Sequence, residues 1–266
     1  MEESLKKLPW KWTHKKTSYK VNSPLTIGVD VVSSYKVRAD AVGVEGIFNT
    51  SHFKRQRDCA NILKMHPGLK GRDEVYSIYP DGKTKKRVFC DMTTEGGGWT
   101  VIQRRINAGT TNFYRTWKDY KTGFGQARLD YWLGNDAIHT LTSHSTQELW
   151  VDLEQFSGSK AYARYSKFAI DGEKNKYKLS ISGYSGNAGD GLRHHNGIVF
   201  ATKDRPDSSS CTKTNQGAWW YNGCYHSNLN GPYQKSALNT YTAIVWIPWK
   251  DKTALKSARM MIRPKK

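Results

Sequence analysis

Long apolar segments are missing from this 266-residue chain. No run of apolar residues approaches the roughly 20 that a helix needs to cross a bilayer, which excludes a transmembrane protein and membrane insertion. Hydrophobic residues make up only 37% of the chain and the mean hydropathy is -0.73, so little aliphatic material is available for a core. Aromatic residues supply part of that core, with 10 Trp, 15 Tyr and 8 Phe. Rings bury a large area each and often keep a polar edge exposed, which favours a loop-rich globular protein over a disordered one.

Catalytic motifs are also missing. The segment 183–187 (GYSGN) lacks the final glycine of a nucleophile elbow, and the chain has no H-E-x-x-H, P-loop or G-x-G-x-x-G motif. His194 and His195 are adjacent in a glycine-rich stretch, and we interpret them as solvated side chains rather than metal ligands. The sequence therefore predicts that the protein is not an enzyme. Because no nucleic-acid-binding motif is present either, it also predicts no nucleic-acid partner.

Acidic residues are few, with 23 Asp and Glu against 42 Lys and Arg, which gives a net charge of +19. Residues 1–58 hold 11 basic and 6 acidic groups, or +5, so +14 remains on residues 59–266. The excess is therefore not confined to a basic tail. Such a field favours polyanionic partners such as sulfated glycans, but charge alone does not choose among them.

Only four cysteines are present: Cys59, Cys90, Cys211 and Cys224. None forms a C-x-x-C pair, which argues against a zinc ribbon or a thioredoxin-like site. Taken in order, their spacings suit two sequential disulfides, and the alternative is four buried thiols. An even count favours a secreted protein. Residues 1–7 lack the apolar core of a signal peptide, so either the signal is missing from this chain or export is unusual.

The chain divides into two regions of different composition. Residues 1–48 form a basic lead: six lysines lie in the first 20 positions, and valine-rich pieces in 21–48 predict a few strands. Residues 49–266 are predicted to form one domain. Asn49 begins the sequence Asn-Thr-Ser, which predicts a glycosylated surface loop in a secreted protein.

Local patterns predict several elements of that domain. Cys59, Ile62 and Leu63 have the spacing of a short amphipathic helix that residues 66–68 (HPG) must end. A second helix is predicted over 127–142, and residues 183–236 read as a long loop region. Strands are predicted at 76–79, 88–90, 99–102, 149–153 and 258–263.

Five segments resemble the fibrinogen C-terminal domain family, and they occur in that family's order. They are 90–105, 131–139, 217–224 (GAWWYNGC), 227–231 (SNLNG) and 260–264 (MMIRP). The resemblance covers about residues 56–264. It implies an α+β domain in which a twisted antiparallel sheet with short helices carries a loop-rich binding subdomain. It also implies the disulfides Cys59–Cys90 and Cys211–Cys224, and a cis peptide bond between Gly223 and Cys224.

The same resemblance implies a calcium loop before the third cysteine, normally written with alternating acids. Calcium prefers six to eight oxygen ligands, which is why closely spaced carboxylates are needed. Here Asp204 and Asp207 remain, while Pro206 stands where the middle acid is expected and the loop is several residues short. Calcium is thus the one cofactor implied, with these two aspartates as its ligands. The alternative is a solvated turn.

The ficolin and tachylectin branch of the family implies a pocket for an N-acetyl group, lined by tyrosines and a histidine. In this chain the histidine position is Tyr225, with His226 one step later, and a ring upstream is replaced by Asn215. Tyr221 and Tyr241 supply the other rings. These five residues are the predicted ligand-binding set. Core positions are predicted for Trp219 and Trp220, and a backbone-bonding role for Asn228 and Asn230.

The sequence thus favours a secreted, fibrinogen-related lectin of innate defence that binds glycans or acetylated microbial surfaces. Single sites of this kind are weak, and a homo-oligomer would strengthen them through avidity, although residues 1–55 show no heptads or collagen repeats. The alternative is a receptor ligand or matrix module of the angiopoietin kind. Such a module would dock a protein or sulfated glycan on a basic face, and its binding would weaken steeply with salt.

Overall fold

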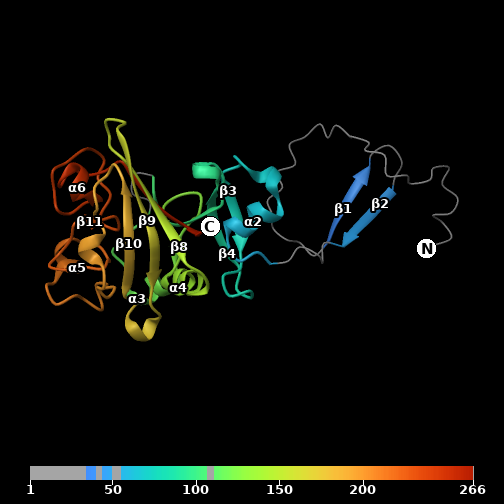
Figure 1. Cartoon of the computed structure of the whole chain (residues 1–266). Helices are drawn as coiled ribbons and strands as arrows, with labels where there is room; N and C mark the ends of the chain where they lie inside the picture. Colours follow the sequence, from blue (N-terminus) through green and yellow to red (C-terminus); the bar gives the residue numbers. More distant parts are fainter. Residues whose placement is uncertain (1–33, 40–43, 50–54, 107–110, 266) are drawn as a thin grey trace.

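A nine-stranded antiparallel sheet organises the domain. The computed structural model describes residues 34–39, 44–49, 55–106 and 111–265 (Figure 1). In the main path of the sheet the strand order is β10-β9-β8-β13-β5-β4-β3, and β7 attaches to β5 with β6 beside it. Its strands are β3 (Glu74–Ile78), β4 (Lys86–Asp91), β5 (Trp99–Arg105), β6 (Phe124–Gly125), β7 (Tyr131–Trp132), β8 (Gln147–Glu154), β9 (Lys160–Ile170), β10 (Leu179–Gly186) and β13 (Ser257–Pro264).

The C-terminal strand holds the middle of this sheet. β13 pairs with β8 along its whole length on one side and with β5 on the other. Because β13 lies between strands that come from both earlier parts of the chain, residues from Cys59 to Ile262 share one continuous hydrophobic core. The described part is therefore one folding unit from α2 to β13.

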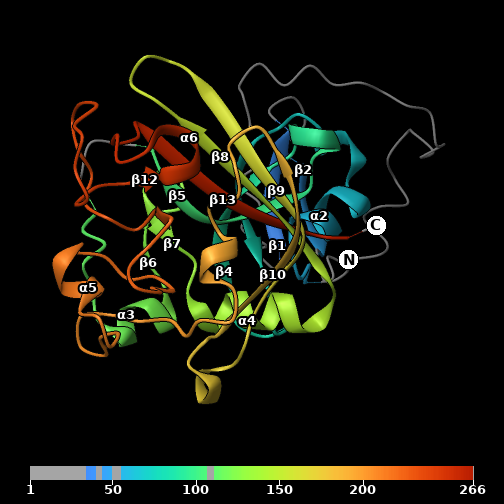
Figure 2. The same ribbon diagram turned by 60° about the vertical axis from the view of Figure 1, so that its left-hand side comes forward.

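The helices are short and lie around the sheet. They are α2 (Cys59–Met65), α3 (Trp117–Thr122), α4 (Asn135–His144), α5 (Cys211–Thr214) and α6 (Ile247–Lys250), with the 3-10 turns η1 (Pro67–Leu69), η2 (Thr94–Gly96), η3 (Glu173–Asn175) and η4 (Arg193–His195). As predicted, α2 ends before Pro67, and Asp58 caps its start by accepting a hydrogen bond from Asn61 N at 2.8 Å. The longest helix, α4, packs on β9 through Ile138 and Leu141 (Figure 2). No helix of the described residues is long and apolar enough to span a membrane.

The two ends of the domain differ in their content of regular structure. Figure 1 shows α2, β3 and β4 at one end, and α5, α6 and β11 (Ser227–Asn228) gathered at the other, beyond β10. β11 pairs with β12 (Val245–Trp246) inside this loop-rich end. One disulfide lies at each end, Cys59–Cys90 and Cys211–Cys224, which confirms the predicted pairing. The predicted cis peptide bond between Gly223 and Cys224 is also present.

The structure corrects two local predictions. The helix predicted over 127–142 begins only at Asn135, because the residues before it form β7 and pair with β5. β9 and β10 were not predicted, although alternate positions of β9 are buried. Two of the buried positions, 161 and 163, are alanines. Because alanine has a low propensity for strands, the alternation is weak in the sequence.

Strands are present in the valine-rich region, as predicted. β1 (Ser34–Ala39) and β2 (Val44–Asn49) form an antiparallel pair. Asn49 is the last residue of β2, whereas Thr50 and Ser51 of the predicted glycosylation motif lie outside the described residues. The basic lead over 1–20 also lies outside them, so its character and the boundary at residue 49 stay predictions.

The sheet forks where β5 changes neighbour. β5 pairs with β4 only at Thr100 and Trp99, and from Gln103 onward it pairs with β7 instead. The Tyr131 hydroxyl bridges the fork: it donates to Val101 O and accepts from Phe89 N at 3.2 Å. Burial of this phenol raises its pKa, so it stays a neutral donor.

We expect Tyr131→Phe to lower the free energy of unfolding by about 1–3 kcal/mol, because two main-chain groups at the fork lose their shared partner. The measurement is urea unfolding. Tyr162→Phe is the control, since its ring is 36% exposed, and it should change stability by less than about 0.5 kcal/mol. Equal effects of the two variants would contradict the role of the bridge.

Candidate functional site

The loop-rich end holds all five predicted ligand-binding residues, and its interior is aromatic. Trp219 and Trp220 are fully buried, as predicted. The Trp220 indole donates to Tyr177 O at 2.8 Å, and its ring meets Phe200 edge to face with centroids 5.1 Å apart. These rings give the loops a rigid base that short strands alone would not supply.

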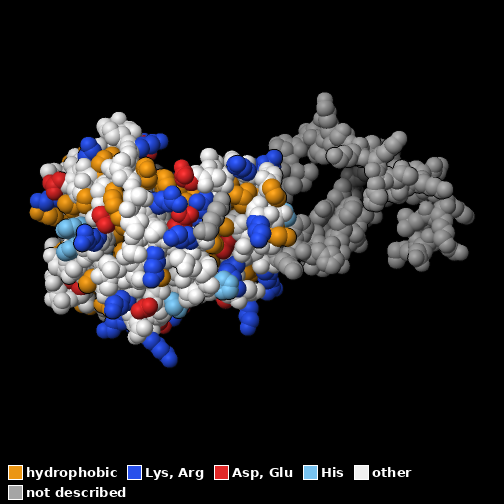
Figure 3. All heavy atoms as spheres, viewed as in Figure 1, with side chains coloured by type: hydrophobic (Ala, Val, Ile, Leu, Met, Phe, Trp, Pro, Cys, Tyr) orange, Lys and Arg blue, Asp and Glu red, His pale blue; other side chains and the backbone are white. Residues whose placement is uncertain are grey.

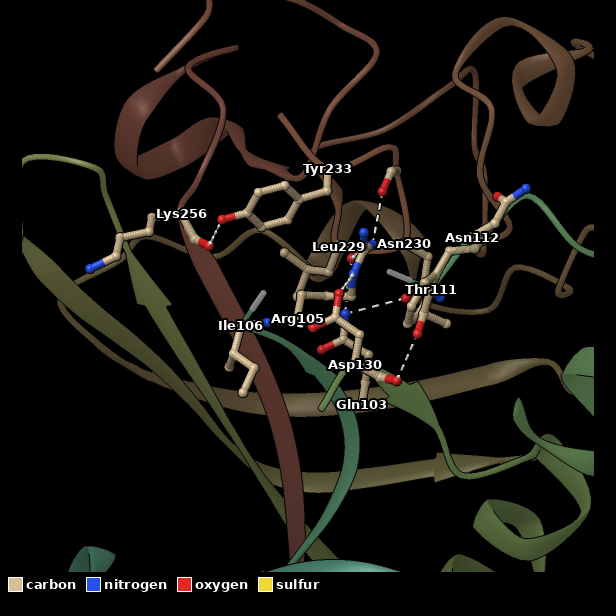
Figure 4. A network of polar contacts seen from close by, with 12 residues as sticks. Gln103, Arg105, Ile106, Thr111, Asn112, Asp130, Leu229, Asn230, Tyr233 and Lys256 are labelled. Atoms are coloured by element: carbon tan, nitrogen blue, oxygen red, sulfur yellow. Dashed lines mark hydrogen bonds and ion pairs between the residues drawn. The ribbon is translucent and has the colours of Figure 1, made fainter. Parts of the chain in front are cut away.

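Two side chains of β5 hold the loop 229–231 from beneath (Figure 4). Arg105, only 1% exposed, donates to Leu229 O at 3.2 Å and to Gly231 O at 2.8 Å, and it pairs with Asp130 at 3.4 Å. Gln103 donates to the same Leu229 carbonyl at 2.9 Å. A buried guanidinium is costly unless its donors are satisfied, so this geometry ties the loop backbone to the sheet.

The loop asparagines complete this frame. Asn230 donates to Ala218 O at 3.1 Å, and Asn228 donates to Ala243 O at 3.4 Å while accepting from the Tyr221 hydroxyl at 3.0 Å. This confirms the prediction that both asparagines satisfy loop groups. Gly231 must be glycine here, because a Cβ would lie 2.2 Å from Ala243 O.

Two of the five predicted ligand-binding residues lie in the interior. Asn215 is 2% exposed and donates to Cys211 O at 2.9 Å, and Tyr221 is 4% exposed. Their side chains are committed to the frame. The ring that the resemblance implied upstream of the tryptophans is thus replaced by an inward amide, so this wall of the expected acetyl pocket is missing.

Tyr225 and Tyr241 are brought together at the surface. The Tyr225 hydroxyl donates to Tyr241 O at 2.5 Å, and the Tyr241 ring is 55% exposed. Lys252 Nζ lies 4.1 Å from the Tyr241 ring centroid, a cation–π contact. We call Tyr225, Tyr241 and Lys252 the ring surface. Lys252 was missed because a lysine 11 positions along the chain carries no local signal for this contact.

His226 is placed with other histidines. Its exposed ring stacks on His194 with centroids 4.1 Å apart. Burial, and next the neighbouring His194, lower the pKa of His226, so the His226 ring favours its neutral form.

The expectation that the adjacent histidines are solvated is wrong for His195, which is fully buried. Its Nδ1 contacts Trp220 O at 2.7 Å, and its Nε2 accepts from His226 N and Ser227 N, each at 3.2 Å. Burial lowers the pKa of His195 from 6.5 to about 3, so it is a neutral imidazole that ties three main-chain groups together.

The two predicted calcium ligands are engaged by the chain itself. Asp204 accepts from Trp117 N and from the Thr202 hydroxyl, both at 2.8 Å. Asp207 caps α5, because its two oxygens accept from the main-chain N–H groups of Ser209, Cys211 and Thr212 at 2.9–3.0 Å.

Donors of the chain therefore occupy both oxygens of Asp207 and one oxygen of Asp204, which calcium would need as ligands. Within the described ranges, no group of three or more His, Cys, Asp or Glu side chains could hold a metal ion. A cation of the chain lies nearby instead, since the Arg205 guanidinium is 4.4 Å from the Trp117 ring centroid. In this conformation the two aspartates do not fit a calcium site.

We expect Arg105→Met to lower the free energy of unfolding by about 3–5 kcal/mol, because it leaves Asp130 and two loop carbonyls without a buried cation. Lys256→Met is the control: it removes an exposed pair with Glu154 and should lower stability far less than Arg105→Met. Urea unfolding of both variants tests this, and a loss at Arg105 no larger than at Lys256 would contradict it.

Stability should also depend on His195. Between pH of about 6.5 and about 3 the unfolded chain binds a proton that the folded chain does not, so the free energy of unfolding falls as pH is lowered. The slope from this one group is at most about 1.4 kcal/mol per pH unit. In urea unfolding from pH about 7.5 to about 5, His195→Gln should show a shallower slope than the original chain. Identical slopes would refute the assignment.

Comparison with known proteins agrees with this geometry. Residues 55–265 match the family described as fibrinogen beta and gamma chains, C-terminal globular domain. The chain is 45% identical to Ryncolin-4 of Cerberus rynchops over 79% of its length, and 42% identical to human Angiopoietin-related protein 7 over 78%. It spans only 61% of the length of each of these relatives.

Among solved structures, the fibrinogen-like globe domain of human ANGPTL6 is similar, with a TM-score of 0.75 and 38% identity over 79% of this chain and 96% of that one. Fibrinogen-like domains of this kind are non-enzymatic binding modules. The chain therefore belongs to the family of the fibrinogen C-terminal globular domain.

Proposed function

We propose that this protein is an extracellular glycan-binding protein, lectin-like, that takes its ligand at the ring surface. The observation that carries this proposal is the exposed Tyr241 ring, held by the Tyr225 hydroxyl and flanked by Lys252. Most other rings of the domain are buried, so Tyr241 is the aromatic ring of the described loops that is best placed to meet a ligand.

The chemistry of this surface suits a saccharide. The apolar face of a sugar ring packs on an aromatic side chain, and its hydroxyls bond to polar groups at the edge. Lys252 adds a donor and a positive charge, which favours sugars that carry an acidic substituent. Because Tyr225 is committed to Tyr241 and Asn215 points inward, we infer ring stacking rather than a closed acetyl pocket.

Two further features support an extracellular role. Both disulfides need an oxidising compartment, and the described residues contain no free cysteine. A single shallow site binds weakly, so recognition of a microbial surface would depend on several copies acting together. Assembly as a homo-oligomer belongs to this proposal.

The test is binding of the whole chain to a glycan panel with neutral N-acetylated, acidic N-acetylated and sulfated members, at low and moderate salt. We expect Tyr241→Ser to weaken binding of N-acetylated members by about tenfold, because stacking is lost. Tyr79→Ser is the matched control, since Arg55 covers that ring at 5.3 Å in the opposite end of the domain.

Binding of N-acetylated members that resists moderate salt and requires Tyr241 would support the lectin function. Binding confined to sulfated members and lost at moderate salt would overturn it. That second result would favour the alternative, a receptor-ligand or matrix module that docks on a basic face.

A further inference from the structure

A cleft of about 530 Å³ opens at the fork of the sheet, far along the chain from the ring surface. One wall is formed by residues of β3 and β4. The other wall is formed by residues 122–128 and 131–133. The cleft exists because β4 and β7 share β5 as a neighbour at different heights, so the two strands diverge. Its volume lies in the range of small-ligand sites.

The rim of the cleft is basic. Lys86, Arg87 and Arg128 line it, and no Asp or Glu does. Within the described residues, Lys86 and Arg87 form no ion pair, while Arg128 pairs with Glu74 at 2.7 Å with its side chain 60% exposed. Lys86 Nζ donates to Thr122 O at 2.6 Å, which fixes its head group at the mouth.

Acidic groups lie nearby but are engaged elsewhere. Asp81 and Asp136 line the adjoining hollow on the other side of Lys86. Asp81 accepts from Lys83 N and Thr84 N in its own turn, and Asp136 pairs with Lys121 at 3.1 Å. Both carboxylates still act on the Lys86 ammonium, and Glu74 pairs with Arg128, so Arg87 is the cation of the cleft that has no ion pair within the described residues.

The floor of the cleft is apolar and close to main chain. Phe124 and Trp132 line it, together with Gly123 and Gly125. Both glycines have positive φ, and a Cβ on either would lie within 2.4 Å of a carbonyl oxygen of the facing strand. The two glycines therefore let their segment pack closely against residues 130–133.

The basic rim continues beyond the cleft. Lys83 and Lys85, both exposed, lie on the turn between β3 and β4 just before Lys86. Figure 3 shows Lys and Arg side chains gathered at this end of the β3–β4 hairpin. A row of cations leading into a cleft fits a polymer with repeated negative charges better than an isolated anion.

We propose that this cleft is a second ligand site, separate from the ring surface, that binds a sulfated glycan chain. Sulfates contact Arg87, Arg128 and Lys86, and a sugar ring lies against the floor at Phe124. An acidic peptide is the rival ligand for such a cluster of cations.

The test uses a heparin hexasaccharide as the probe and the double variant R87Q/R128Q. We expect the variant to bind it at least about tenfold more weakly, and its affinity to depend less on salt, because two charge-assisted contacts are lost. The matched control is K174Q/K178Q, which removes two exposed cations near η3 with the same change of net charge. It should weaken binding by less than about twofold.

Three results would overturn the proposal. Equal weakening by both double variants would show diffuse attraction rather than a site. Competition by a poly-glutamate peptide of equal charge, as strong as by the hexasaccharide itself, would show that the cleft does not select a glycan. Loss of hexasaccharide binding in Tyr241→Ser would place sulfated ligands on the ring surface. Tyr241→Ser also separates this site from the proposed lectin function. R87Q/R128Q should leave the binding of N-acetylated glycans at the ring surface unchanged.

Discussion

The buried guanidinium of Arg105 is the interaction on which the binding loops depend. Loops with few apolar residues cannot fix their own shape, so their carbonyl groups need donors from a rigid element. Strand β5 supplies them through Arg105 and Gln103, and Asp130 balances the charge. His195, a neutral imidazole of the loop-rich end, also ties main-chain groups together. Its Nδ1 contacts Trp220 O, and its Nε2 accepts from His226 N. Polar groups held by a strand thus give an irregular segment a single conformation.

Two surfaces result, and they rely on different forces. At the ring surface, Tyr241 is exposed on a loop beside the frame, and the affinity proposed for it would come from stacking and hydrogen bonds. The cleft at the sheet fork is lined by Arg87 and Arg128, and the affinity proposed for it would come from charge. Salt separates the two, because screening weakens exposed charges far more than stacked rings. The two proposals therefore assign neutral and anionic glycans to separate places on a chain with a net charge of +19.

Inside the loop-rich end, contacts within the chain replace features that the family resemblance implied. Both oxygens of Asp207 accept from main-chain N–H groups at the start of α5, and Oδ1 of Asp204 accepts from Trp117 N at the start of α3, so these oxygens serve the fold of the chain. Asn215 turns inward where a ring was expected. The same local motifs therefore support a different surface chemistry, because hydrogen bonds to main chain compete directly with bonds to a ligand.

The sequence by itself determined the family and, through that resemblance, both disulfides. It also indicated the buried tryptophans and the strands β3, β4, β5, β8 and β13, because alternation of side chains is a local signal. It did not show β9, whose buried positions 161 and 163 are alanines, or the start of α4 at Asn135. Only the tertiary structure decided that Tyr241 meets Lys252, that His195 is buried, and that β4 and β7 diverge into a basic cleft. Each of these joins residues distant in sequence, and such contacts depend on how the elements pack rather than on any local pattern.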